Sequence, residues 1–278
     1  MTDNWSASNY VKHASFVPKL GNIILDLLDA QPTEHVLDFG CGDGVLTKEL
    51  ATRCKSVIGV DSSRRMITSA NQDKPENTSY MTVDGYDLDT WFNQTQNSNY
   101  FDAVFSSATL HWLKRDPVKI IRNIRYVLKP QGRFVTEFGG FMNCGGKAYK
   151  NYLIKVGQMT NLIIEIQTGL ISALNRRGLN GQSYSPWFFP SAEYYSKLLT
   201  ENGFQVVQAE LCPRITELNT DIVGWIEMFG FDFLKDIPVE EHKQVALEVQ
   251  EHLRPSYQRE DGKWCIMYNR LRIIAIKK

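Results

Sequence analysis

The sequence predicts one large α/β domain built on a doubly wound parallel sheet, and three observations support this fold class. Short apolar segments alternate with segments of helical periodicity along most of the chain, which is the pattern of strand–helix–strand units. The apolar segments are nearly continuous, as expected of strands that helices cover on both faces. The chain has 278 residues, of which 43% are hydrophobic, so a core of full domain size can form.

The first elements follow one another in regular order. Apolar residues at helical spacing predict a helix over residues 15–30, which should stop before Pro32. Five strands are then predicted, over 35–39, 56–60, 79–83, 101–105 and 132–138, and the helices between them over 44–53, 63–71, 88–93 and 117–128. Together these segments predict the parallel part of the sheet.

The pattern changes after Phe138. A glycine-punctuated loop leads into a helical region over 147–174, and a polar stretch over 176–185 is predicted to be an exposed loop. Ser191 can cap a helix that ends before Gly203. The remaining elements expected are a strand over 204–211, helices over 221–234 and 239–253, and a last strand over 264–276.

Composition excludes several classes of protein. Lys plus Arg and Asp plus Glu each count 31, so the basic excess of a typical nucleic-acid binder is missing. No signal peptide and no membrane span is predicted, because the N-terminus lacks a basic start and no apolar run approaches ~18 residues. The five cysteines form no C-x-x-C pair, so neither a metal site nor a disulfide framework is expected. We expect a cytoplasmic protein that acts on a small molecule.

The strongest motif lies between Val36 and Gly44. A buried strand ends there in a loop with Gly40 and Gly42, and a helix follows. Glycine lets backbone approach a ligand closely, and the helix N-terminus adds free N–H groups and positive potential. The G-x-G-x-G spacing differs from the G-x-G-x-x-G spacing of dinucleotide sites. Cys41 is predicted to fill space in this loop, since no neighbouring His or Lys would activate it as a nucleophile.

Two carboxylates accompany this loop. Asp38 precedes the first glycine by two residues, where it can meet a ligand ammonium directly or through water. Asp61 ends the second strand, where it can accept hydrogen bonds from both hydroxyls of a ribose, and Ser62 follows it. Each such charge-assisted bond contributes roughly 1.5–3 kcal/mol. The motif therefore suits a nucleoside that carries an amino-acid group.

The third and fourth strands end at the same edge of the sheet. Asp84 can accept from an adenine amine, with Gly85 giving a backbone contact, and a helix cap is its alternative role. Ser106 either lies against the ligand or simply permits close packing. His111 follows the fourth strand, where ligands bind in this architecture. Its ordinary pKa near neutrality makes it a candidate base, and anchoring the loop or lining the pocket is the alternative.

These motifs resemble those of the class I methyltransferases that use S-adenosylmethionine. The glycine loop, Asp61, Asp84 and the segment 102–112 occur in the family's order, and residues 128–134 match its turn into the fifth strand. Gln131 stands in that turn where glycine is more usual. The resemblance runs from about residue 5 to the last strand. Segments 133–140 and 186–191 are typical of the branch that holds the trans-aconitate methyltransferases and the cyclopropane-fatty-acid-synthase-like proteins.

The resemblance implies a Rossmann-like sheet of seven strands, the last one antiparallel, and S-adenosyl-L-methionine as cofactor. The residues expected to bind the cofactor are Asp38, Gly40, Cys41, Gly42, Gly44, Asp61, Ser62, Asp84, Gly85, Ser106 and Tyr10. Tyr10, Lys12 and His13 are interpreted as part of a lid, with a frayed terminus as the alternative.

A single methyltransferase domain is expected over residues 1–278. Its parts would be an N-terminal lid and helix to about residue 30, a cofactor-binding core over 31–140, and helical insertions over 141–190 and 213–260 that cap the substrate. Aromatic residues at 187–189 are predicted either to line an apolar pocket or to be core, and those at 225–233 to pack the insertion on the sheet. Arg270 and Arg272 are predicted on a solvated strand face, with contact to a substrate carboxylate as the alternative.

The predicted reaction is methyl transfer to a small molecule, and the branch resemblance favours O-methylation of a carboxylic acid. C-methylation remains an alternative within the enzyme class, and a catalytically silent S-adenosylmethionine-binding protein remains one outside it. A nicotinamide-dependent oxidoreductase is disfavoured by the glycine spacing and by the position of Asp38. The sequence leaves the acceptor and the oligomeric state open, because fold alone does not fix chemistry.

Overall fold

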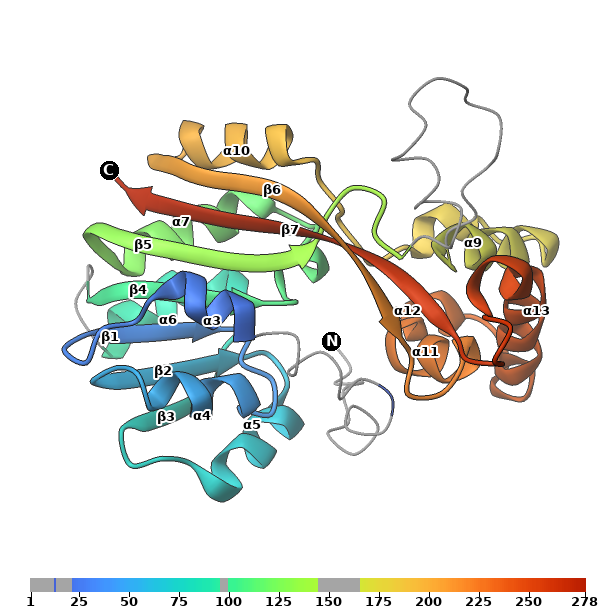
Figure 1. Ribbon diagram of the computed structural model, residues 1–278, viewed down its shortest axis with the longest axis horizontal. Coiled ribbons are helices and arrows are strands. Elements are labelled where there is room, and N and C mark those ends of the chain that lie inside the picture. The colour runs from blue at the N-terminus through green and yellow to red at the C-terminus, as the bar shows by residue number, and fades with distance from the viewer. Residues whose placement is uncertain (1–12, 14–21, 96–99, 145–165) are drawn as a thin grey trace.

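A computed structural model describes residues 13, 22–95, 100–144 and 166–278. Seven strands form one sheet in the order β3-β2-β1-β4-β5-β7-β6 (Figure 1). Their bounds are β1 (His35–Phe39), β2 (Ser56–Asp61), β3 (Thr78–Thr82), β4 (Phe101–Ser107), β5 (Leu128–Gly139), β6 (Phe204–Glu217) and β7 (Cys265–Lys277). The first five strands pair in parallel, and β7 runs antiparallel to both β5 and β6. The predicted fold class, with its antiparallel last strand, is confirmed.

Helices cover both faces of the sheet, which explains the continuous apolar strands. On one face, α3 (Asn22–Leu28) and α4 (Val45–Ala51) pack on side chains such as Val36 and Phe105. On the other, α6 (Leu88–Thr95), α7 (Pro117–Val127) and α10 (Ala192–Glu201) pack on Leu37 and Val104. Because strand side chains alternate between faces, neighbouring residues such as Val36 and Leu37 serve separate cores. A further helix, α5 (Arg64–Ala70), lies beside β3.

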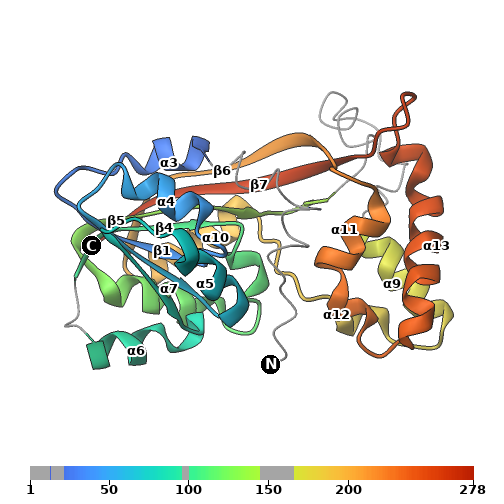
Figure 2. The ribbon, with the colours of Figure 1, turned by 90° about the horizontal axis from the view of Figure 1, so that it is seen from below.

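A helical lobe stands at the far end of β6 and β7, beyond the rest of the sheet (Figures 1 and 2). It contains α9 (Ile166–Arg176), α11 (Ile222–Phe229), α12 (Phe231–Leu234) and α13 (Val239–Tyr257). These helices share a hydrophobic cluster of their own, which also takes in Trp264, Ile266 and Tyr268 from the start of β7 and the segment before it. The two longest strands thus connect the sheet to the lobe.

Several predicted boundaries shift in the structure. Strand β6 continues past residue 211 to Glu217, so residues 213–217 are strand rather than part of a helical insertion. Pro213 hid this extension, but β6 is the edge strand, where a residue without an N–H is tolerated. The predicted helix over 221–234 is divided at Gly230 into α11 and α12. The predicted segments 15–21 and 147–165 lie outside the described residues.

Strand β5 begins at Leu128 instead of residue 132, and the register with β4 shifts between Phe101 and Ala103. Gln131 adopts a left-handed φ of 63° in this irregular stretch. Such a backbone favours glycine, which gives a physical reason for the glycine that is more usual at this position. Among the described helices, none is long and apolar enough to cross a membrane.

Candidate functional site

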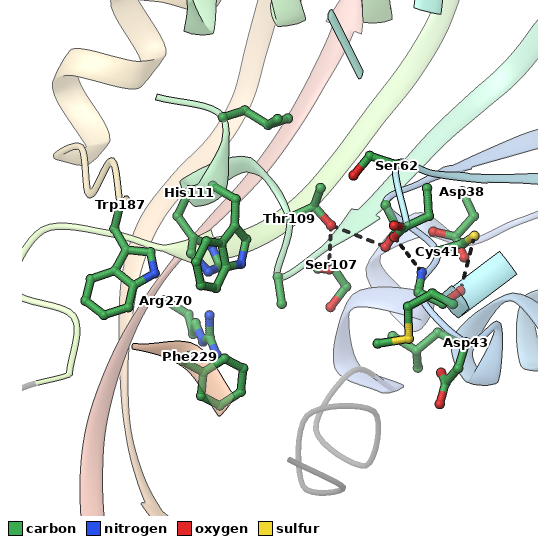
Figure 3. Close-up of a pocket in the computed structure, with 18 of the residues that line it drawn as sticks. Asp38, Cys41, Asp43, Ser62, Ser107, Thr109, His111, Trp187, Phe229 and Arg270 are labelled. Atoms are coloured by element: carbon green, nitrogen blue, oxygen red, sulfur yellow. Dashed lines mark hydrogen bonds between the residues drawn. The ribbon is translucent and has the colours of Figure 1, made fainter. Parts of the chain in front are cut away.

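A cavity opens at the carboxyl ends of β1, β2 and β4 and continues to β7 and the helical lobe. Figure 3 shows two ends to it. Asp38, Cys41, Asp43 and Ser62 lie at one end, which we call the loop end, and His111, Trp187, Phe229 and Arg270 lie at the other, which we call the aromatic end. Ser107, the last residue of β4, and Thr109 just after it lie between the two ends.

The three loop glycines have different roles at the loop end. Gly40, Gly42 and Gly44 have φ values of 82°, 56° and 81°, a region that other residues adopt only with strain. A Cβ on Gly40 would lie 2.0 Å from Oγ1 of Thr109, and one on Gly44 would lie 2.5 Å from the hydroxyl of Tyr80. A Cβ on Gly42 would meet no atom of the described residues within 4 Å. Gly40 and Gly42 line the cavity, whereas Gly44 allows close packing behind it.

Asp61 holds the loop through its own carboxylate. Its Oδ2 accepts the N–H of Gly42 at 3.0 Å, and its Oδ1 accepts the N–H of Ser63 at 2.8 Å. Asp61 and Ser62 line the cavity at this point. A carboxylate can accept several hydrogen bonds at once, so an acid that holds the loop at the cavity can also accept from a ligand hydroxyl.

Asp38 is buried at the base of the same end and is 2% exposed. Its Oδ2 accepts the hydroxyl of Thr47 at 2.6 Å. Burial raises the pKa of Asp38 to about 7, and the neighbouring charge of Asp61 adds to the rise. Burial also raises the pKa of the Cys41 thiol well above its usual range, which agrees with a filler rather than a nucleophile.

The loop end is chemically suited to a cation and a nucleoside. Its described lining carries three carboxylates, those of Asp38, Asp43 and Asp61, and no Lys or Arg. A ligand ammonium or sulfonium beside Asp38 would favour its ionised form, which burial now opposes. Gly42 lines the cavity, and no other described residue comes within 4 Å of the place where its side chain would be, so a ligand can approach the backbone here. These residues fit S-adenosylmethionine.

Besides Gly44, three further predicted cofactor residues do not line this cavity. The Oδ1 of Asp84 accepts the N–H of Tyr86 at 2.9 Å, which is the helix-capping alternative. A Cβ on Gly85 would lie 2.6 Å from Cζ of Phe39, so this glycine serves packing. Ser106 is fully buried and donates to the carbonyl oxygen of Phe39 at 2.8 Å. Tyr10 and Lys12 lie outside the described residues.

Ser107 takes the position at the cavity that sequence reasoning gave to Ser106. Phe105 and Ser107 both line the cavity, and they share one face of β4 because side chains alternate along a strand. The buried Val36 and Phe105 pack together on that face, so the apolar pattern of the two strands carried a signal for the correct residue. Ala108 follows with a left-handed φ of 57°, and its N–H donates to the backbone carbonyl oxygen of Glu137 at 2.7 Å.

His111 lies in a short 3-10 helix, Leu110–Trp112, at the aromatic end. Its Nδ1 accepts the backbone N–H of Gly139 at 3.2 Å. Burial lowers the pKa of His111 well below its usual range, and the charge of Arg270 acts in the same direction. The ring is therefore neutral at physiological pH. Because Nδ1 is an acceptor, the single ring proton is on Nε2, which is a donor.

Aromatic rings form the walls of this end. Trp187 lies near the rings of Trp112, Phe189 and Trp225, with centroids 5.7–5.8 Å apart. Phe229 lies 5.2 Å from Trp225. The rings at 187 and 189 thus belong to the pocket, and Trp225 and Phe229 line it too, although they were predicted only to pack the insertion on the sheet.

Arg270 of β7 points into the aromatic end (Figure 3). It is 5% exposed, so the predicted solvated strand face was wrong, because the helical lobe covers this part of β7. Its guanidinium lies 4.4 Å from the ring centre of Tyr268. Within the described residues it has no carboxylate partner, and its Nε is buried without a hydrogen bond. Arg272, two residues on, pairs with Glu137 at 2.7 Å.

His13 is the one described member of the predicted lid. Its Nδ1 lies 3.1 Å from Oγ1 of Thr220, which precedes α11. A Cβ on Gly224 would lie 2.6 Å from the same nitrogen. The N-terminal segment therefore contacts the helical lobe at this residue.

Comparison with known proteins agrees with the fold and the motifs. Residues 37–136 match the methyltransferase domain family. An uncharacterised methyltransferase of Schizosaccharomyces pombe is 35% identical over 99% of both chains. A trans-aconitate 2-methyltransferase of an Azoarcus species is 24% identical over 98% of this chain and 99% of its own.

Among solved structures, the YcgJ protein of Bacillus subtilis has a similar fold. Its TM-score is 0.57 at 17% identity, over 92% of this chain and 97% of that one. The whole-length similarity to the yeast protein includes the helical lobe as well as the sheet. The chain belongs to the class I methyltransferase family, the enzymes that transfer a methyl group from S-adenosylmethionine.

Proposed function

We propose that the protein transfers the methyl group of S-adenosylmethionine to a carboxylate oxygen of a small acid. One observation carries the choice of acceptor: the buried guanidinium of Arg270, which lines the cavity without a carboxylate partner in the described chain. An unpaired buried cation is costly unless a ligand compensates it. A substrate carboxylate is the natural counterion, since a guanidinium binds it through two parallel hydrogen bonds. The relative named trans-aconitate 2-methyltransferase supports an acid.

The loop end would hold the cofactor. The Asp61 carboxylate lines the cavity and can accept from ribose hydroxyls, and Asp38 and the loop amides suit the amino-acid group. When bound, S-adenosylmethionine supplies a methyl group on a positively charged sulfur, and the sulfur keeps the electrons of the broken C–S bond. The tertiary arrangement puts this end and Arg270 in one cavity (Figure 3).

A carboxylate acceptor fits the state of His111. An ionised carboxylate forms the new O–C bond without losing a proton, so alignment provides most of the acceleration. A carbon acid or a phenol would need a base, and Nδ1 of His111 is already occupied by Gly139. We propose that His111 acts through its Nε2–H as a donor to the acceptor, rather than as the base.

The cofactor assignment is tested by calorimetric titration with S-adenosylhomocysteine, with NADH as the control ligand. We expect micromolar binding of the homocysteine compound and none of NADH. The acceptor class is tested by incubating the protein and S-adenosylmethionine with matched acids, amides and phenols, and detecting products by mass spectrometry. Methyl esters are expected. Methylation of a phenol or an amide in place of the acids would overturn the proposal, and no turnover on any acceptor would favour the silent binding protein.

A further inference from the structure

We infer that the acceptor is a monocarboxylic acid with an apolar body, and not a di- or tricarboxylate. This inference rests on the proposed function, because it takes the Arg270 guanidinium as the partner of the acceptor carboxylate. It adds the identity of the rest of the molecule. Two independent features of the aromatic end support it, namely the count of charges and the chemistry of the walls.

The charges allow for one carboxylate. Among the described residues that line the cavity, Arg270 is the one Lys or Arg. His111 is neutral, since burial holds its pKa well below the usual range. Arg272, the next cation on the same strand face, is paired with Glu137. In the same part of the chain, the acidic residues that line the cavity are Asp38, Asp43 and Asp61, which repel anions.

A second carboxylate on the acceptor would therefore be poorly placed. With its first carboxylate on Arg270, the acceptor would place a second one among apolar rings, neutral polar side chains such as Ser107 and Thr109, or the carboxylates of the loop end, and none of these described groups is a cation. Burial of a charge without a partner is strongly unfavourable. The site thus discriminates against polyanions by leaving their extra charges unpaired, which is an effective form of specificity.

The walls favour an apolar body. Trp187 and Phe189 are stacked with an interplanar angle of 17°, and Trp225 and Phe229 extend this surface. The indole N–H of Trp225 donates to the hydroxyl of Tyr268 at 2.7 Å. This donor is consumed inside the wall, so the Trp225 ring presents its apolar face. Such rings bury a large area against an apolar ligand.

The experiment measures binding of three acids to the full chain saturated with S-adenosylhomocysteine. The probes are trans-cinnamate (a flat aromatic acid), octanoate (an aliphatic one) and trans-aconitate (a tricarboxylate), and cinnamamide serves as the uncharged control. We expect at least one monocarboxylate to bind about tenfold or more tightly than trans-aconitate. Comparison of the affinities for cinnamate and octanoate then shows whether the site prefers a flat aromatic or an aliphatic acid.

Each other outcome has a definite meaning. Tighter binding of trans-aconitate would overturn this inference and leave the carboxylate acceptor intact. Equal binding of cinnamate and cinnamamide would overturn the proposed function itself, because the charge would then be irrelevant. Failure of both monocarboxylates to bind would also overturn the inference.

Two substitutions test whether the aromatic walls of the cavity select the acceptor. Trp187→Leu should weaken binding of the preferred monocarboxylate about tenfold while binding of S-adenosylhomocysteine stays unchanged. Trp91→Leu is the matched control, since Trp91 lies on α6 beneath the sheet and does not line the cavity. Equal effects of the two substitutions on acid binding would show that the walls do not select the acceptor.

Discussion

The two ends of the cavity differ in how the chain builds them. The lining of the loop end comes largely from residues 38–66, a stretch that runs from the end of β1 through α4 and β2 to the start of α5. The aromatic end gathers residues from positions 111, 143, 187, 225 and 270, which lie on separate elements. A local motif therefore fixes one end, whereas packing of distant segments creates the other.

The ends also differ in charge. Carboxylates lie at the loop end, and the guanidinium of Arg270 lies at the aromatic end. This separation suits a cationic cofactor and an anionic acceptor that must meet in one cavity. If each end acts on its own ligand, substitutions at one end should leave the ligand of the other end unaffected.

Asp61→Asn should have the largest effect, on cofactor binding. Both carboxylate oxygens of Asp61 accept backbone N–H groups of the loop, and an amide can replace only one of them. We expect affinity for S-adenosylhomocysteine to fall by about 100-fold, as measured by calorimetry. Circular dichroism checks that the variant is folded. An unchanged affinity in a folded variant would mean that Asp61 does not contribute to the cofactor site.

Arg270→Met should act on the other end alone. It removes the partner of the acceptor carboxylate, so kcat/KM for the acid should fall by roughly 50-fold, with unchanged binding of S-adenosylhomocysteine. Arg272→Met is the matched control, because this arginine pairs with Glu137 and does not line the cavity. It should lower the melting temperature but spare KM. A similar loss of kcat/KM in both variants would contradict a specific role for Arg270.

Replacing His111 should lower the reaction rate modestly, and the wild-type rate should show no titration step near neutral pH. With its pKa held well below the usual range by burial, the ring is neutral above that pKa and charges only at lower pH. The wild-type kcat at saturating cofactor should therefore be flat between about pH 6 and pH 9. His111→Phe should lower kcat/KM about tenfold through loss of the Nε2 donor. A step near pH 6.5 in the wild-type profile of kcat against pH that disappears in this variant would support His111 as a general base.

Asp38→Asn should have the smallest effect, an increase in the stability of the cofactor-free protein. The raised pKa of about 7 means that the fold favours the protonated acid. Between the ordinary pKa of an aspartate in the unfolded chain and pH 7, the folded protein keeps a proton on Asp38 that the unfolded chain has lost. Asp38 therefore lowers the free energy of unfolding as pH rises through this range, and its destabilising effect levels off above pH 7. The isosteric amide removes that cost and can still accept from Thr47.

The Asp38→Asn variant should therefore melt roughly 2–4 °C higher than wild type at pH 8, with a smaller difference at pH 5. Differential scanning calorimetry of the cofactor-free protein measures both. The same variant should bind S-adenosylhomocysteine more weakly, because it lacks the charge for the ammonium group. A lower melting temperature at pH 8 would show that the ionised carboxylate stabilises the fold.

Much of the fold could be predicted from local patterns. Apolar runs identified the five parallel strands, since burial on both faces leaves this mark on a sequence, and the last two strands were predicted as well. The errors were at boundaries, where the left-handed backbone of Gln131 in β5 and the proline at position 213 of β6 interrupt the pattern. Asp84 and Ser106 lay at the expected strand ends, yet their side chains meet backbone groups beside them instead of the cavity.

The sequence alone determined the family, the sheet and the loop end, because these depend on residues close together in the chain. The spacing of Gly40, Gly42 and Asp61 carries its meaning locally, through one turn and two paired strands. Only the tertiary structure decided the environment of Arg270. A strand residue is exposed or buried according to what packs on it, and here a lobe formed by distant helices covers it and surrounds it with rings.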